Sequence, residues 1–122
     1  MTTREMINYV ELPAKNIPAT KAFFERAFAW TFIDYGGEYT AFSNSGIEGG
    51  FFQSELVSST ANGACLLVLL SDDLEASELR VKSAGGTISQ AIFSFPGGRR
   101  FHFTEPSGNE LAVWSPVKAY IA

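Results

Sequence analysis

The stretch FHFTEPSGNEL, residues 101–111, decides the fold. Its first half alternates aromatic with polar residues, which is typical of a strand that buries one face. Pro106-Ser107-Gly108-Asn109 then supplies residues that favour a tight turn. A second strand-like segment follows from Glu110, so the stretch predicts two strands joined by a short turn.

Outward from this turn, one pattern of elements occurs twice along the chain. Each copy is predicted to contain a strand, a helix and three further strands. The first copy covers about residues 6–53, with strands at residues 6–12, 31–35, 38–43 and 48–53 and a helix capped by Asn16. The second covers about residues 64–115, with strands at residues 66–70, 87–89, 99–104 and 110–115 and a helix that begins within residues 72–77. Residues 54–63 are polar and are predicted to link the two copies.

A βαβββ module buries one face of its sheet under its helix and leaves the other face bare. Two such modules can place their bare faces around a common concave space. We therefore predict a single α+β domain over residues 1–122, in which two βαβββ modules form a curved mixed sheet around a cleft, with the helices outside. The cleft is the expected binding site, because ligand sites are concave.

The composition narrows the classes of partner. With a net charge of -4, the chain is not expected to bind nucleic acid, whereas a cationic ligand would be attracted. No stretch approaches the roughly 18 apolar residues of a membrane span, so no membrane partner is expected. The lone Cys65 lies in an apolar run and is predicted to be buried. It cannot form an internal disulfide, and a cytoplasmic location is the default expectation.

The sequence resembles the glyoxalase / bleomycin-resistance / ring-cleaving dioxygenase superfamily, also called the vicinal oxygen chelate superfamily. Residues 101–111 are similar to the family's Phe-x-Asp-Pro-x-Gly-Asn turn between the last two strands. In the first module Asn16 stands where Asp is usual, and Ala22-Phe23-Phe24 and Phe28-Ala29-Trp30 stand where members often carry Phe-Tyr and Phe-Gly-Trp. The resemblance runs from about residue 6 to 115. It implies the fold more strongly than the function, because this fold hosts many chemistries.

The resemblance also implies four metal-ligand positions, which metal-using members fill with His, Gln or Glu. Three of them map onto Tyr9, Leu66 and Ala112, and the fourth maps near Gly49-Gly50. None of these residues offers the imidazole or carboxylate that such metals need. We therefore expect no cofactor.

A divalent metal, Zn, Ni, Fe or Mn, is the alternative. Glu110 lies two positions before the expected glutamate, and Glu48 lies beside Gly49-Gly50, so either one is a weak candidate ligand. The chain has one histidine, which argues against a histidine-based site.

Strand alternation identifies the side chains that face the cleft. If Tyr9 faces it, Glu11 does too, while Val10 turns away; Trp114 likewise shares a face with Ala112. The resemblance points to the strand before the Pro-Ser-Gly-Asn turn as well. The predicted ligand-binding residues are Tyr9, Glu11, Phe52, Arg100, His102 and Trp114.

Each of these residues can instead have a purely structural role. Glu11 and Arg100 can form a partly buried ion pair, and Arg99 with Arg100 can be a solvated pair. A lone histidine such as His102 is often a structural residue. Trp114 can lie at the edge of the core or in a dimer contact.

Two classes of function follow. The first is a metal-free small-molecule-binding protein that holds an aromatic or cationic ligand in the cleft. The resemblance implies a homodimer here, since bleomycin-sequestering members are small, acidic, metal-free dimers. The second is a lyase, isomerase or epimerase of the glyoxalase type, with a divalent metal or with His102 as general base, oriented by Glu11, and Arg100 stabilising an enolate. An interaction module without a ligand is a third possibility.

Overall fold

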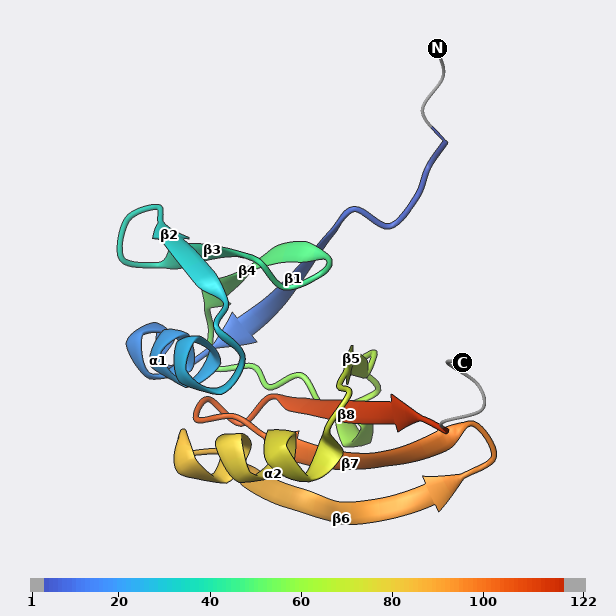
Figure 1. Ribbon diagram of the computed structural model, residues 1–122. Helices are drawn as coiled ribbons and strands as arrows, with labels where there is room; N and C mark the ends of the chain where they lie inside the picture. Colours follow the sequence, from blue (N-terminus) through green and yellow to red (C-terminus); the bar gives the residue numbers. More distant parts are fainter. Residues whose placement is uncertain (1–3, 118–122) are drawn as a thin grey trace.

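The computed structural model describes residues 4–117 and confirms the repeated βαβββ pattern (Figure 1). The first module consists of β1 (Tyr9–Ala14), α1 (Ile17–Phe28), β2 (Thr31–Asp34), β3 (Tyr39–Ser43) and β4 (Glu48–Gln53). The second consists of β5 (Leu67–Leu70), α2 (Leu74–Ser83), β6 (Thr87–Phe95), β7 (Gly98–Thr104) and β8 (Glu110–Pro116). A single 3-10 turn, Thr60–Asn62, lies in the segment that joins them.

Both helices begin where capping chemistry predicts. The side chain of Asn16 accepts a hydrogen bond from the backbone N–H of Ala19, and the side chain of Asp73 accepts one from Ala76. These bonds satisfy backbone donors that a helix N-terminus leaves without partners. No helix within residues 4–117 has the length and apolar character needed to cross a membrane.

The strands form two four-stranded sheets with the same internal order. Sheet A has the order β1-β4-β3-β2 and sheet B has the order β5-β8-β7-β6. In each sheet the first strand of the module runs parallel to the last, and the other pairs are antiparallel. The α+β architecture of two mixed-sheet modules is therefore confirmed.

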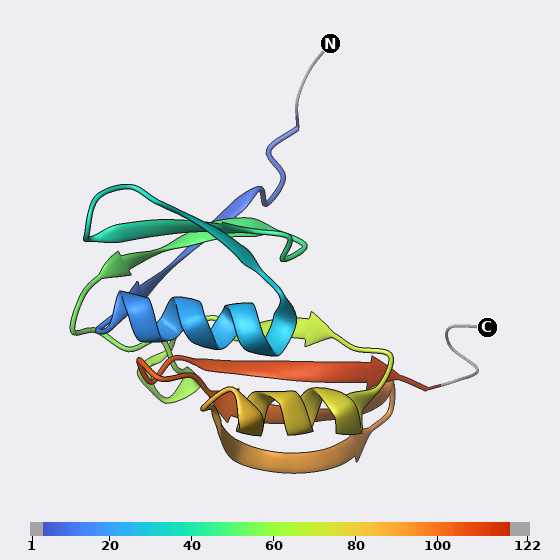
Figure 2. The same cartoon turned by 60° about the vertical axis from the view of Figure 1, so that its left-hand side comes forward.

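The two modules share one hydrophobic core, in which α1 lies between sheet A and sheet B (Figure 2). Phe24 stacks on Trp30 with ring centres 4.4 Å apart and lies 5.5 Å from Phe51 of β4. Phe23, on the same helix, lies 5.6 Å from Phe103 of β7. Each helix thus covers the face of its sheet that points into the core. The opposite face of each sheet, the open face, carries no helix.

The Pro-Ser-Gly-Asn turn ties the two modules together through the buried carboxylate of Glu105. Thr20 of α1 donates to its Oε1 at 2.7 Å, and the backbone N–H of Ser107 donates to the same oxygen at 2.8 Å. Asn109 donates to its Oε2 and to the carbonyl of Pro13 in β1, both at 2.6 Å. Burial raises the pKa of Glu105, while these donors act in the opposite direction.

Two expectations were wrong. β6 runs from Thr87 to Phe95 instead of ending at Ser89, because its pairing with β7 shifts register twice and the shifts break the alternation that marks a strand. Cys65 is exposed, because it lies just before β5 and outside the core.

Candidate functional site

The open face of sheet A is lined by alternate residues of β1, β4 and β3. In β1, Leu12 is buried while Tyr9 and Glu11 are exposed, as alternation predicts. The register places Tyr9 opposite Glu48, and Glu11 opposite Gly50. Phe52, two residues beyond Gly50, shares this face.

A chain of three polar side chains crosses this open face. The hydroxyl of Tyr39 in β3 donates to Glu11 Oε2 at 2.8 Å and lies 2.7 Å from the hydroxyl of Tyr9. Gly50 makes room for it, because a Cβ at position 50 would overlap the hydroxyl and ring of Tyr39. Burial, together with the hydrogen bonds to Tyr9 and Glu11, holds the pKa of Tyr39 well above its usual value.

The open face of sheet B is more basic and more aromatic. The register pairs Arg100 with Trp114. The Arg100 guanidinium carbon lies 5.5 Å from the ring centre of Phe93 and 5.9 Å from that of Phe95, both in β6. These are cation–π distances. Arg100 is thereby held between aromatic rings, with its Nε buried and without a hydrogen-bond partner among residues 4–117.

His102 is held by Glu110 at the other end of this face. His102 Nδ1 lies 3.1 Å from Glu110 Oε2, and Thr60 donates its N–H and its hydroxyl to Glu110 Oε1 at 2.8 and 2.9 Å. The Thr60 N–H and then His102 lower the pKa of Glu110, which favours the ionised carboxylate. Since a carboxylate only accepts, the network assigns a proton to Nδ1. His102 Nε2 is buried and has no hydrogen-bond partner among the described residues.

The predicted residues fall into two groups, one on each sheet. Tyr9, Glu11 and Phe52 lie on sheet A, and Arg100, His102 and Trp114 lie on sheet B. Among residues 4–117, no hydrogen bond or ion pair joins the two groups.

Three expected contacts are corrected. Glu11 does not pair with Arg100, because its carboxylate binds Tyr39 and the guanidinium stacks on Phe93 and Phe95. Glu110, not Glu11, orients His102. Arg99 and Arg100 do not form one solvated pair: Arg99, 42% exposed at its side chain, makes two hydrogen bonds, at 2.6 and 3.1 Å, to the Glu75 carboxylate, whereas Nε of Arg100 is buried.

Sequence reasoning missed Tyr39, Phe93 and Phe95. A signal for Tyr39 existed, because Thr40 and Phe42 alternate with it and are buried, which turns Tyr39 to the open face. No comparable signal marked Phe93 and Phe95, which follow the register shifts of β6.

The residues present do not fit a bound metal. Glu11 opposite Gly50 in sheet A corresponds to Val68 opposite Ala112 in sheet B, so the fourth ligand position is Gly50. The four positions thus hold a phenol, a glycine and two hydrocarbon side chains, and Tyr39 covers the glycine. Within residues 4–117 no three His, Cys, Asp or Glu side chains gather to bind an ion. Glu110 is already bound by Thr60 and His102, and Glu48 belongs to no such group of three within the described residues.

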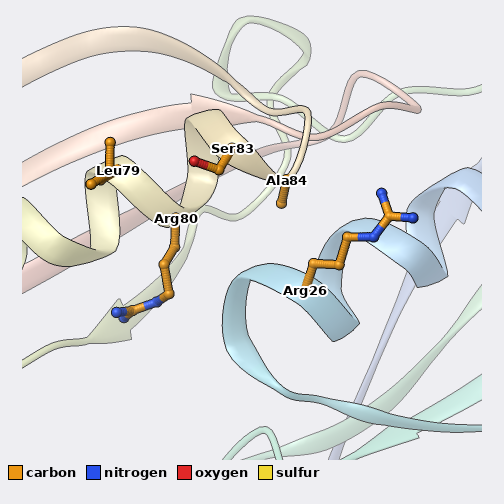
Figure 3. Close-up of a pocket in the computed structure, with 5 residues that line it drawn as sticks. All are labelled: Arg26, Leu79, Arg80, Ser83 and Ala84. Atoms are coloured by element: carbon orange, nitrogen blue, oxygen red, sulfur yellow. The ribbon is translucent and has the colours of Figure 1, made fainter.

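Two hollows elsewhere do not form a site. One, of about 360 Å³, lies between the end of α1 and α2 (Figure 3). Its two arginines diverge, and Arg80 already donates to the Ala27 carbonyl and the Ser77 hydroxyl, so it joins the helices. The other, of about 610 Å³, lies at the start of α2, and two of the residues that line it, Arg99 and Glu75, are paired with each other.

A family model described as Glyoxalase/Bleomycin resistance protein/Dioxygenase superfamily matches residues 6–113. The chain belongs to this superfamily. The match spans both modules and ends within β8.

Solved structures of the superfamily share the fold at low sequence identity. A fosfomycin resistance protein from Listeria monocytogenes is 13% identical, with a TM-score of 0.77 over 96% of this chain and 98% of that chain. A glyoxalase-related enzyme from Fulvimarina pelagi is 15% identical, with a TM-score of 0.76 over 92% and 88%. An antibiotic binding protein from Streptomyces is 16% identical, with a TM-score of 0.68 over 95% and 99%. No curated protein matches the sequence.

Proposed function

We propose that the protein is a metal-free small-molecule-binding protein. Its ligand, aromatic or cationic, lies between the open faces of sheet A and sheet B. The observation that carries this proposal is the filling of the fourth ligand position: the Tyr39 phenol occupies the space over Gly50 and is bound to Glu11. A face rich in aromatic rings and hydrogen-bonding groups, without a metal-ligand set, suits an organic ligand.

We propose further that a second copy of the chain completes the cleft. The open faces of one chain share no hydrogen bond or ion pair among residues 4–117. They are also complementary in charge, since sheet A presents Glu11 and Glu48 while sheet B presents Arg100. Val68 and Leu70, on the open face of the edge strand β5, are 44% and 70% exposed, which a partner would cover. A homodimer brings sheet A of one protomer against sheet B of its partner.

The relatives and the surface thiol agree with these proposals. One structural neighbour is described as an antibiotic binding protein, which is a binding function on this fold. The exposed thiol of Cys65 suits a reducing compartment, and we propose a cytoplasmic location.

A thermal-shift screen tests the binding function. The panel contains aromatic amines, aromatic acids, neutral aromatics and glycopeptide antibiotics, and separate wells contain Zn²⁺, Ni²⁺, Fe²⁺, Mn²⁺ or EDTA. We expect at least one organic class to raise the Tm by roughly 10 °C at 100 times its Kd. The metals and EDTA are expected to leave both the Tm and this shift unchanged. Stabilisation that requires a metal, or no stabilisation by any organic class, would contradict the proposal.

The Glu110–His102 pair supports a second candidate, a metal-free lyase, isomerase or epimerase. With Nδ1 held by Glu110, His102 Nε2 can take a proton from the carbon beside a carbonyl. Arg100, two residues away on the same face, would stabilise the enolate oxygen. The test is exchange of that proton with D₂O in a panel of carbonyl compounds. Wild type should catalyse exchange and His102→Gln should not; equal exchange by both would reject this candidate.

A further inference from the structure

The hydrogen bonds of the Glu11–Tyr39–Tyr9 chain on sheet A all point the same way, from Tyr9 through Tyr39 to Glu11. Tyr39 has one hydroxyl proton and donates it to Glu11 Oε2. Its oxygen can therefore only accept from Tyr9, which lies 2.7 Å away. The raised pKa of Tyr39 keeps that hydroxyl protonated at neutral pH. The hydroxyl proton of Tyr9 is thus donated to Tyr39. The Tyr9 oxygen, at the open end of the chain, can therefore only accept a hydrogen bond from a ligand.

A second free acceptor lies beside the first. Glu11 Oε1 has no hydrogen-bond partner among residues 4–117, whereas Oε2 is bound by Tyr39. The Tyr9 oxygen and Glu11 Oε2 each lie within hydrogen-bond distance of the same Tyr39 oxygen, so both acceptor groups belong to one part of the open face. Tyr9 is 43% exposed, which leaves this end of the chain accessible.

Gly50 keeps the chain in this arrangement. It lies between Glu11 of β1 and Ala41 of β3 in the sheet, and its missing side chain lets the Tyr39 ring lie across the strand. Any side chain at position 50 would displace the Tyr39 hydroxyl from Glu11. Tyr39 is therefore held as part of the surface that a ligand meets.

We propose that Tyr39 is a specificity-determining residue, and that the Glu11–Tyr39–Tyr9 chain selects ligands whose ammonium group carries N–H. This inference rests on the proposed binding function and names the ligand class. An N⁺–H group donates to the Tyr9 oxygen and to Glu11 Oε1, and such charge-assisted bonds are strong. A quaternary ammonium has no N–H and retains only its attraction to the rings and to the carboxylate. A carboxylate ligand is repelled by Glu11 and Glu48.

Titration calorimetry with three matched probes tests this on the full chain. The probes are phenethylamine, its N,N,N-trimethyl analogue and 3-phenylpropionate, which share a phenyl ring and differ in the charged group. We expect wild type to bind the primary amine on the order of tenfold more tightly than the trimethyl analogue, the effect of one charge-assisted hydrogen bond. Binding of 3-phenylpropionate should be weaker still.

Two variants assign the preference to Tyr39. Tyr39→Phe frees Tyr9 to rotate and donate, so the preference should fall to within about threefold. Tyr35→Phe is the matched control, because Tyr35 is 63% exposed, lies next to Tyr39 at 6.5 Å between ring centres and makes no side-chain hydrogen bond among the described residues. It should keep the wild-type preference. If Tyr39→Phe does not fold, Glu11→Gln serves instead, since it removes the charge that the ammonium needs.

The outcomes separate this inference from the binding function. Equal or tighter binding of the trimethyl analogue by wild type overturns the inference and leaves small-molecule binding intact. No binding of either amine also overturns it; the thermal-shift screen then decides whether other classes bind or the binding function falls as well. A preference that survives in Tyr39→Phe overturns the role of Tyr39.

Discussion

Glu110 shows how one side chain is shared between a structural and a functional contact. One carboxylate oxygen accepts from Thr60, in the segment between the modules, and the other faces His102 in β7. His102 is the titratable group that faces it among the described residues, and Thr60 is uncharged. The arrangement fixes the ring of His102 and anchors residues 60–62 to β8.

The lowered pKa of Glu110 gives the pair a pH dependence. Its folded-state pKa lies below the usual value of 4.5, so its contribution to stability is present above that value and is lost as the pH falls through the lowered pKa. Glu110→Gln cannot titrate. We expect it to lower the free energy of unfolding by about 1–3 kcal/mol at pH 7 and by much less at pH 3. Urea denaturation at the two pH values measures this.

Glu48→Gln is the matched control for Glu110→Gln. Glu48 also begins the last strand of its module, but its carboxylate is exposed and makes no hydrogen bond or ion pair among the described residues. It should change the free energy of unfolding little at either pH. If Glu110→Gln lowered the free energy of unfolding equally at pH 7 and pH 3, the ionised form of the Glu110 carboxylate would not contribute to stability.

For single residues, the sequence predicted the sheet face on which a side chain lies better than the residues that the side chain contacts. Alternation correctly separated Tyr9 and Glu11 from Leu12, and Arg100 from Phe101, because a strand has only two faces. It could not find that Tyr39 reaches Glu11, since that contact depends on the β3–β4 register and on the empty space over Gly50.

The element that departs most from expectation is β6, and it shapes the wall of sheet B. Its register shifts between Ile88 and Gln90 and between Gln90 and Phe93 still bring Phe93 opposite Arg100. The Phe93 ring then lies 6.0 Å from the ring of His102, as well as over the guanidinium of Arg100. The bulged strand therefore places an aromatic ring beside both unpartnered nitrogens of this face.

Phe93→Ala should expose His102. The chain has a single histidine, so modification by diethylpyrocarbonate reports on His102 alone. We expect the variant to react several-fold faster than wild type, because Nε2 is buried in the native face. Phe95→Ala is the control, since Phe95 contacts Arg100 and Trp114 and no ring contact joins it to His102. Similar rates in wild type and Phe93→Ala would show that the ring does not cover Nε2.

Helices and most strands were predictable because their signals are local. A capping side chain, a stripe of buried residues or an alternating run lies within a few positions of the element it defines. β6 escaped because a bulge inserts residues without partners and shifts the period by one. The burial of Cys65 was overestimated because an apolar run does not reveal where its strand begins.

At the scale of the whole molecule, the helix-covered faces of the two sheets pack together in one core, and the open face of each sheet is left uncovered. The repeat correctly predicted two modules, but it also predicted that their bare faces would enclose a cleft with the helices outside. Within the chain the helix-covered faces meet instead, and α1 lies between the two sheets (Figure 2). In the chain, Phe23 of α1 reaches Phe103 of β7, and Thr20 reaches Glu105. The candidate site is consequently divided between two walls that a second protomer would unite.

Leu70→Glu tests the proposed dimer. Leu70 lies on the open face of β5 and is 70% exposed, so a charge there costs the isolated chain little but is unfavourable in an apolar interface. We expect wild type to sediment with the mass of two chains and Leu70→Glu with the mass of one. Leu79→Glu is matched in exposure, at 65%, but lies on α2 away from the open faces, and should stay dimeric. Monomeric wild type, or dissociation of both variants alike, would reject this interface.

The Tyr39 ring over Gly50 fixes the order in which substitutions could introduce a metal ligand at position 50. A glutamate at position 50 cannot supply a ligand while Tyr39 fills the space above it, since even a Cβ would overlap the phenol. Tyr39 would have to be replaced first, and that step breaks its hydrogen bonds to Glu11 and Tyr9 before any metal affinity is gained. A metal ligand at position 50 therefore needs two substitutions in a fixed order, and the first of them gives up two hydrogen bonds before the second can add a ligand.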